Sequence, residues 1–220
     1  SQMNVEGHNF DMRKHLVEYD DVMNKQRETI YKKRKGILLL SEGKKFENYE
    51  TLSDYVMEMI ETEINEIVSF HTASDHGTVW NINEIFESVK TIYPLTDEEI
   101  EKFNELMKRD EKDEKLAEAQ KRTNIIEYFS NLAKIKYEEL KTRISKIEGI
   151  ENIKNPIGEI EKGILLRSID SLWIEHLDNI DHLRTGIGLR GYAQTDPLVE
   201  YKRETYQLFV ELLNNIEKQV

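Results

Sequence analysis

The sequence predicts an all-α fold, on three observations. Only 3 Pro and 10 Gly interrupt the 220 residues, so few positions break a helix or force a turn. The apolar–polar alternation that is typical of a half-buried strand is hard to find. Instead, apolar residues recur every three or four positions, as they do on one face of a helix. We expect a long scaffold helix packed with a C-terminal antiparallel helical hairpin, and a helical subdomain inserted between them.

Composition excludes several classes of protein. Charged residues make up 34% of the chain, and 31 basic against 43 acidic residues give a net charge of −12. This balance argues against nucleic acid as the main partner, because phosphate binding requires a basic face. The absence of Cys excludes a disulfide framework and Cys-ligated zinc, and agrees with a reducing compartment. The chain begins SQMNVEG, without an initiator Met at position 1, so we expect a piece of a longer protein.

The first predicted element is one long helix over residues 9–40. The apolar residues of this helix follow a heptad-like spacing, and Gln26 lies at a position where that spacing predicts an apolar side chain. A helix of about 30 residues spans about 45 Å. This length suits a scaffold along which several domains dock, but a long core helix of an ordinary bundle would show the same pattern. The apolar positions of the predicted seam are Met12, Leu16, Tyr19, Met23, Ile30 and Ile37.

The middle of the chain, residues 46–153, is predicted to form a separate helical domain. We expect helices over 52–68 and 82–93, the second ended by Pro94, and a further helix begun by a capping box at Thr96–Glu99. In the highly charged run 108–122 we expect a break near Asp110, followed by a helix over about 113–147. The linker EGIENIKNPIGE at 148–159 is the best domain boundary, so the expected domains are 1–45, 46–153 and 154–220.

Residues 169–213 predict the hairpin. Its first helix should end near the glycines at 186, 188 and 191, each of which lowers helix propensity by about 1 kcal/mol relative to Ala. Its second helix should begin at Asp196–Pro197, where Asp caps the helix and Pro takes the first turn. The tip is therefore predicted at about 185–195. The apolar face of the first helix is Ile169, Leu172, Trp173, His176, Ile180, Leu183 and Ile187; that of the second is Val199, Tyr206, Phe209, Leu213, Ile216 and Val220.

Two sets of residues in this region are candidates for function. The tip presents Arg184, Arg190, Tyr192 and Gln194, and Tyr192 lies between Gly191 and Ala193, where it can project without burial. Such a side chain can pack against extended polypeptide of any sequence, although a solvated loop without function predicts the same residues. The second set is the expected scaffold packing between Trp173 and His176 of the hairpin and Tyr19 and Met23 of the long helix.

The candidate nucleotide-binding motifs are incomplete, and the candidate metal-binding sites are weak. Gly186–Gly191 matches GxGxxG but follows a helix rather than a strand, and Gly158–Gly163 lacks the Lys of a phosphate loop. His176 and His182 are about 240° apart around a helix and cannot share one ion. The pair Asp178 and His182 and the acidic group Glu18, Asp20 and Asp21 leave a weak metal site open, which is the basis of a metalloenzyme alternative. A solvated face or a salt-bridge surface is the simpler interpretation of both.

Two runs resemble one known family. DSLWIEHLDNIDHLRTGIGLRGYAQTDPLVEYKRETYQLF is similar to the two-helix finger of the SecA family, the ATP-driven motors of bacterial preprotein secretion. VEGHNFDMRKHLVEYDDVMNKQRETIY is similar to the start of that family's long scaffold helix. The middle of the chain is assigned to the family's helical wing domain by position only.

The resemblance implies a function. It implies a fragment without nucleotide-binding motifs or cofactor of its own, belonging to a translocating ATPase that uses ATP and Mg. The finger loop, with Arg190, Gly191, Tyr192 and Gln194, would contact the SecY channel and the unfolded preprotein, and the scaffold would contact the parent's ATPase domains. The implied location is cytoplasmic, peripherally associated with the inner face of the plasma membrane. The alternative is a free-standing helical adaptor without motor function, for which the tip would be dispensable.

Overall fold

A computed structural model describes residues 2–73, 80–112, 118–150, 152–190 and 196–220. The described residues contain helices and no strand, which confirms the predicted all-α class; Phe46 and Tyr49 form an isolated antiparallel bridge. None of the described helices is long and apolar enough to cross a membrane. The helices are α1 (Gln2–Ser41), α2 (Leu52–His71), α3 (Ile82–Val89), α4 (Asp97–Lys112), α5 (Glu118–Ile144), α6 (Pro156–Arg190) and α7 (Pro197–Gln219).

The chain divides into two compact units. Residues 1–52 and 160–220 form one, here the scaffold unit, and residues 53–159 form the other, here the inserted unit. The two ends of the chain thus build one unit around an insertion, as the sequence predicts. The joints lie between Leu52 and Ser53 and between Glu159 and Ile160, slightly later at both places than the domain boundaries expected from composition.

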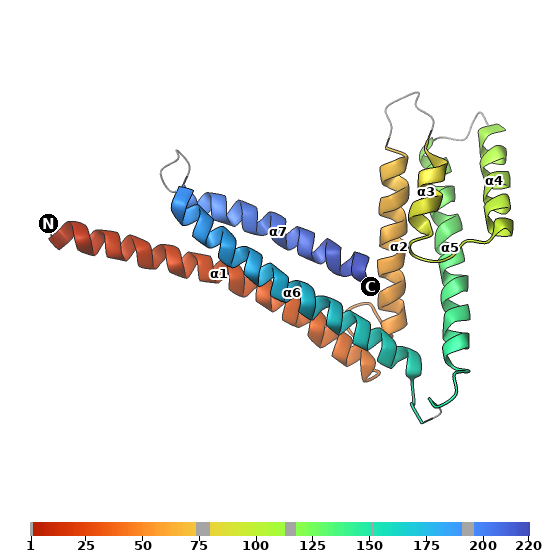
Figure 1. The fold of residues 1–220 in the computed structure, drawn as a ribbon, viewed down its shortest axis with the longest axis horizontal. Helices are drawn as coiled ribbons and strands as arrows, with labels where there is room; N and C mark the ends of the chain where they lie inside the picture. Colours follow the sequence, from red (N-terminus) through yellow and green to blue (C-terminus); the bar gives the residue numbers. More distant parts are fainter. Residues whose placement is uncertain (1, 74–79, 113–117, 151, 191–195) are drawn as a thin grey trace. The chain divides into compact units, whose positions relative to one another are not determined.

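In the scaffold unit, α1, α6 and α7 run side by side, with α6 antiparallel to both of the others (Figure 1). The register between α1 and α6 is marked by a bidentate ion pair: Arg34 Nε lies 2.7 Å from Asp170 Oδ1, and Arg34 Nη2 lies 2.9 Å from Asp170 Oδ2. This fork geometry aligns two helices whose paired residues are far apart in sequence. Buried apolar side chains from all three helices fill the space between them, among them Ile30, Ile37, Leu165, Ile169, Leu212 and Ile216.

α6 begins earlier than the sequence suggests. The predicted linker 148–159 ends at Pro156, which takes the first turn of the helix, where a missing N–H costs nothing. Asn155 provides the cap, since its Oδ1 accepts a hydrogen bond from Gly158 N at 3.1 Å. Gly158 therefore lies within the first turn of a helix instead of in a loop, because a local cap outweighs its low helix propensity.

The inserted unit has its own core, built by one face of each of its helices. Phe86 of α3, Phe103 of α4 and Phe129 of α5 meet there, with ring centroids 5.0–6.0 Å apart. The capping box predicted for α4 is confirmed: Thr96 N donates to Glu99 Oε2 at 2.8 Å, and Glu99 N donates to Thr96 Oγ1 at 3.3 Å. The remaining buried core residues are Ile64, Val68, Ile85, Val89, Tyr93, Ile125, Leu132 and Ala133.

The charged run differs most from its prediction. α4 continues through Asp110 to Lys112, so the break expected near Asp110 is wrong. The carboxylate of Asp110 is only 3% exposed and accepts a hydrogen bond from Asn124 Nδ2 at 2.8 Å, which ties the end of α4 to α5. The next helix, α5, ends at Ile144, before the predicted end near 147, and its predicted start near 113 lies outside the described residues. In a run of mostly charged residues, the sequence does not distinguish a buried, paired carboxylate such as that of Asp110 from the exposed ones.

Gly36 allows a close approach between α1 and the loop that follows it. A Cβ at Gly36 would lie 2.3 Å from Cε1 of Phe46, whose ring covers the helix there. Gly163, in the middle of α6, is the opposite case, because a Cβ there would meet nothing within 4 Å. One glycine is therefore required by packing, and the other lies on an open helix face.

This difference predicts opposite effects of the same substitution. Gly163→Ala should raise the free energy of unfolding of the scaffold unit by about 0.5–1 kcal/mol, through helix propensity alone. Gly36→Ala should lower it by about 1–3 kcal/mol, because the Phe46 ring must be displaced. Urea unfolding followed by Trp173 fluorescence in a Trp80→Phe background measures both changes.

Phe46→Ala serves as the control background for this test. Once the ring is removed, Gly36→Ala should behave like Gly163→Ala. A loss of stability that persists without the ring would show that Phe46 is not the cause.

Candidate functional site

The hairpin of α6 and α7 is the candidate site, and its first helix is longer than predicted. The predicted tip at 185–195 begins too early, because α6 runs through Gly186 and Gly188 to Arg190. The reason is Ile187, which is 2% exposed and packs with Ile180 and Tyr201. Burying an isoleucine contributes about 1.5–3 kcal/mol, which offsets the low helix propensity of its glycine neighbours. Tertiary packing therefore carries the helix past residues that disfavour it.

The second helix of the hairpin begins as predicted. Asp196 caps α7, with its Oδ1 accepting a hydrogen bond from Leu198 N at 3.0 Å, and Pro197 takes the first turn. Of the residues expected to form the finger loop, Arg190 is the last residue of α6, whereas Gly191, Tyr192 and Gln194 lie outside the described residues.

The end of the hairpin is held against α1 by two tyrosines and one arginine. The rings of Tyr19 and Tyr201 are 4.3 Å apart, and the guanidinium of Arg184 lies 5.8 Å from the centre of the Tyr19 ring. Arg184 also lies 3.9 Å from the carboxylate of Asp20. Arg184 was expected to be presented at the tip, but its side chain instead faces α1. This group is the tyrosine cluster of the scaffold.

The tyrosine cluster is partly shielded from water. Burial raises the pKa of Tyr19, and the charge of Asp196 raises it further, while Arg184 acts in the opposite direction. Burial likewise raises the pKa of Tyr201. Both hydroxyls therefore stay neutral at ordinary pH, and the two rings pack against each other. Val22, Met23, Leu183 and Leu208 pack around this cluster and the neighbouring Ile180 and Ile187.

A buried polar network joins all three helices one to two turns farther along. His176 Nε2 lies 2.7 Å from Gln26 Oε1, and Gln26 Nε2 donates to the backbone carbonyl of Thr205 at 3.2 Å. The carbonyl can only accept, which fixes the orientation of the Gln26 amide. Its oxygen must then accept from His176, so the imidazole carries its proton on Nε2. One residue from each helix takes part in a chain of two hydrogen bonds.

Aromatic packing surrounds the imidazole of this network. The rings of Trp173 and His176 are stacked with centroids 5.4 Å apart, and the Phe209 ring lies 5.8 Å from His176 on the other helix of the hairpin. His176 is 4% exposed, and burial lowers its pKa to about 4. Burial therefore keeps the imidazole neutral in the folded protein at ordinary pH, with its Nε2–H available to Gln26.

The sequence predicted a packing role for His176 but missed Gln26 and Thr205, because these two polar residues interrupt apolar faces. Gln26 counted as an imperfection in the seam of α1, yet it is buried and bonded to both other helices. On α7 the predicted face is wrong in part, since Val199 and Tyr206 are 57% and 67% exposed. Including Thr205 as a core position would have found the true face, which consists of Leu198, Tyr201, Thr205, Leu212 and Ile216.

Metal-binding groups are not assembled in the part of the chain that the structure describes. There, no three His, Cys, Asp or Glu side chains are placed to hold a metal ion together. Asp20, one member of the acidic group considered as a metal site, lies beside Arg184 instead.

The network predicts an acid-sensitive scaffold. Because burial depresses the pKa of His176 from 6.5 to about 4, the unfolded chain binds an extra proton between these values. The stability that the neutral imidazole provides is thus complete above pH 6.5 and is lost as the pH falls toward 4, by about 3 kcal/mol in all. Urea unfolding at several pH values, followed by Trp173 fluorescence in a Trp80→Phe background, measures this loss.

His176→Gln separates this effect from the titration of carboxylates. The variant keeps a hydrogen-bonding group but cannot titrate, so its stability should fall less than that of the parent between pH 6.5 and 4. Equal pH dependence in both proteins would contradict the role assigned to the imidazole.

Comparison with known proteins extends over the whole chain. The family model of the SecA Wing and Scaffold domain matches residues 1–220. Protein translocase subunit SecA of Thermodesulfovibrio yellowstonii is 39% identical over 98% of this chain and 20% of that protein. Those of Halothermothrix orenii and Heliobacterium modesticaldum are 37% and 36% identical over 100% of this chain, and 22% of each is covered.

The chain therefore spans about a fifth of the length of these relatives. The match includes residues 46–153, for which the sequence offered no motif. The chain belongs to the SecA Wing and Scaffold domain family.

Proposed function

We propose that this chain is the force-transmitting part of a protein-translocating motor of the SecA type. In this proposal, ATPase domains elsewhere in the parent protein hydrolyse ATP with Mg. The scaffold unit couples them to the movement of an unfolded preprotein through the SecY channel. The observation that carries the proposal is the α6–α7 hairpin, fastened to the long helix α1 by the Gln26–His176–Thr205 network.

The geometry of the scaffold unit supports a lever. α6 is 35 residues long, which corresponds to about 52 Å, and a hydrogen-bonded helix of this length is stiff. From His176 to Arg190 the helix rises about 21 Å beyond the network that fastens it. A rotation of α1 of a few degrees, passed on by the network and by the Arg34–Asp170 pair, would displace the end of the hairpin by ångströms.

The residues between the two helices would contact the preprotein. By the resemblance, Tyr192 makes this contact, with Arg190, Gly191 and Gln194 as its neighbours in the loop. An aromatic side chain offers apolar area and one hydroxyl to any extended chain, so it holds different sequences with similar strength. A motor requires such weak, sequence-tolerant contact, because uniformly tight binding would stall it.

The same proposal places the protein at the cytoplasmic face of the plasma membrane, attached peripherally through the channel complex. Its partners are then the SecY complex, the unfolded preprotein and the ATPase domains of the parent chain. The net charge of −12 gives no support to nucleic acid as a partner.

Replacing Tyr192 in the full-length parent protein tests the proposal. Tyr192→Ala should slow the import of a preprotein into vesicles that contain SecY by about two- to tenfold, because an aromatic contact is worth about 0.5–1.5 kcal/mol. ATP turnover should remain. Tyr192→Phe keeps the ring and should retain most of the import rate.

Tyr206→Ala is the matched control, since Tyr206 is an exposed tyrosine of the same hairpin that lies on α7 away from the loop. It should leave import unchanged. Normal import by Tyr192→Ala, with normal ATP turnover, would remove the role of the loop and favour the adaptor alternative.

A further inference from the structure

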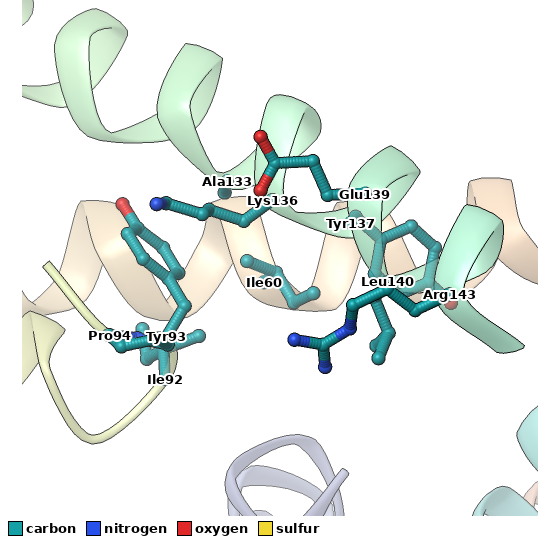
Figure 2. Close-up of a pocket in the computed structure, with 10 residues that line it drawn as sticks. All are labelled: Ile60, Ile92, Tyr93, Pro94, Ala133, Lys136, Tyr137, Glu139, Leu140 and Arg143. Carbon is teal, nitrogen blue, oxygen red and sulfur yellow. The ribbon is translucent and has the colours of Figure 1, made fainter.

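The inserted unit contains a hollow of about 290 Å³ between α2, α5 and the segment that follows α3. Figure 2 shows its walls, in which aliphatic side chains and two tyrosine rings surround an opening. This volume lies just below the range of about 300–1,000 Å³ for ligand pockets, so it suits one side chain better than a larger ligand. Its apolar and aromatic walls are Ile60, Ile92, Tyr93, Pro94, Tyr137 and Leu140.

Two polar groups in these walls are already paired. The hydroxyl of Tyr93 donates to the carbonyl of Phe129 at 2.8 Å, so the residue offers its ring to the hollow. The ammonium of Lys136 lies 2.7 Å from a carboxylate oxygen of Glu99, and both side chains are less than 20% exposed. A ligand would have to break these bonds to use either group, so neither is available for recognition.

Arg143 is the available cation at the rim. It lies in the last turn of α5, is exposed, and has no carboxylate within ion-pairing distance among the described residues. Figure 2 shows its guanidinium turned toward the hollow, on the side opposite to the carboxylate of Glu139. One side of the opening therefore attracts an anion, and the other side repels it.

We propose that this hollow binds an extended polypeptide segment in which a large apolar residue is followed by an acidic one. The apolar side chain fills the hollow, and the carboxylate pairs with Arg143. A guanidinium that forms no ion pair within the described part of the chain, beside an apolar hollow of side-chain size, is complementary in charge and shape to this occupant. The proposal concerns the inserted unit alone and does not depend on the role proposed for the hairpin.

The carboxylate comes from an acidic side chain and not from the end of a chain. Terminal carboxylates are captured by groups of free backbone N–H donors. Around this hollow, Lys136, Leu140 and Arg143 all lie inside α5, where the backbone N–H groups are used by the helix. The remaining donor is the guanidinium of Arg143, on a flexible side chain that can pair with the side-chain carboxylate of an internal Asp or Glu.

Peptide titrations against the 220-residue chain test the proposal. The probe is acetyl-Gly-Phe-Asp-Gly-amide, and binding is followed by NMR through the backbone amide signals of Ile92, Tyr93 and residues 133–143. We expect saturable shifts of these signals. Peptides with Ala in place of Phe, or Asn in place of Asp, should bind more weakly by about threefold or more, since each loses one of the two contacts.

A fourth peptide, acetyl-Gly-Ser-Gly-Phe with a free carboxyl end, separates the two sources of a carboxylate. If it binds more tightly than the Phe-Asp peptide, the hollow recognises chain ends and the proposal is overturned.

Arg143→Gln supplies the test on the protein side. It should weaken the Phe-Asp peptide by about threefold to fivefold and leave the affinity for the Phe-Asn peptide unchanged. Lys146→Gln is the matched control, because it removes the same charge at a nearby exposed residue that does not line the hollow. Equal effects of the two variants, or no shift at Ile92, Tyr93 and residues 133–143 with any peptide, would overturn the proposal.

Discussion

The scaffold unit depends on one buried hydrogen-bonded chain, from His176 through the amide of Gln26 to the carbonyl of Thr205. These groups come from three different helices, and each is largely removed from water. A buried polar group without a partner costs about 1–3 kcal/mol, so sliding any one helix along the others would leave several such groups unpaired. Apolar packing alone tolerates small shifts in register. The network is the constraint that excludes them.

This constraint explains the distribution of the other contacts. The Arg34–Asp170 pair lies on one side of the network and the tyrosine cluster on the other, so the helices are aligned along most of their shared length. The Arg34–Asp170 pair, and Tyr19 and Arg184 of the cluster, are more exposed than the network, so their polar contacts contribute less individually. The Arg34–Asp170 pair and the tyrosine cluster hold the helices in the same register as the network does. Several contacts that favour one register together keep a long bundle with a narrow core in a single arrangement.

The sequence predicts much of this structure, and its errors have physical causes. The buried face of α6 follows from periodicity because residues such as Trp173 and Ile180 are apolar. On α7 the true face passes through Thr205, and a rule that counts apolar residues selects a neighbouring face that contains the exposed Tyr206. The end of α6 depends on Ile187, whose burial against Tyr201 cannot be known before the helices are placed. Asp110 is similar, since its partner Asn124 comes from another helix.

The features of the candidate site likewise divide into those that local sequence predicts and those that depend on contacts between distant segments. Its location on a hairpin follows from the Gly-rich stretch and the Asp196–Pro197 start, which are local signals. The partner of Arg184 on α1, and the joining role of Gln26, depend on contacts between distant segments. Local signals therefore identify that a hairpin forms and where its second helix begins, whereas the end of its first helix and its attachment to α1 require the fold.

The separation of these partners along the chain bears on how the protein is synthesised. Gln26 is 150 residues from His176 and 179 from Thr205, so the exposed seam of α1 leaves the ribosome long before anything can cover it. At about 5–20 residues per second, the delay is about 8–30 s. The core of the inserted unit needs only residues from Ile64 to Ala133 and is complete within that interval. Nascent chains therefore carry a finished inserted unit and an uncovered amphipathic helix, which is the substrate that a ribosome-associated chaperone would meet.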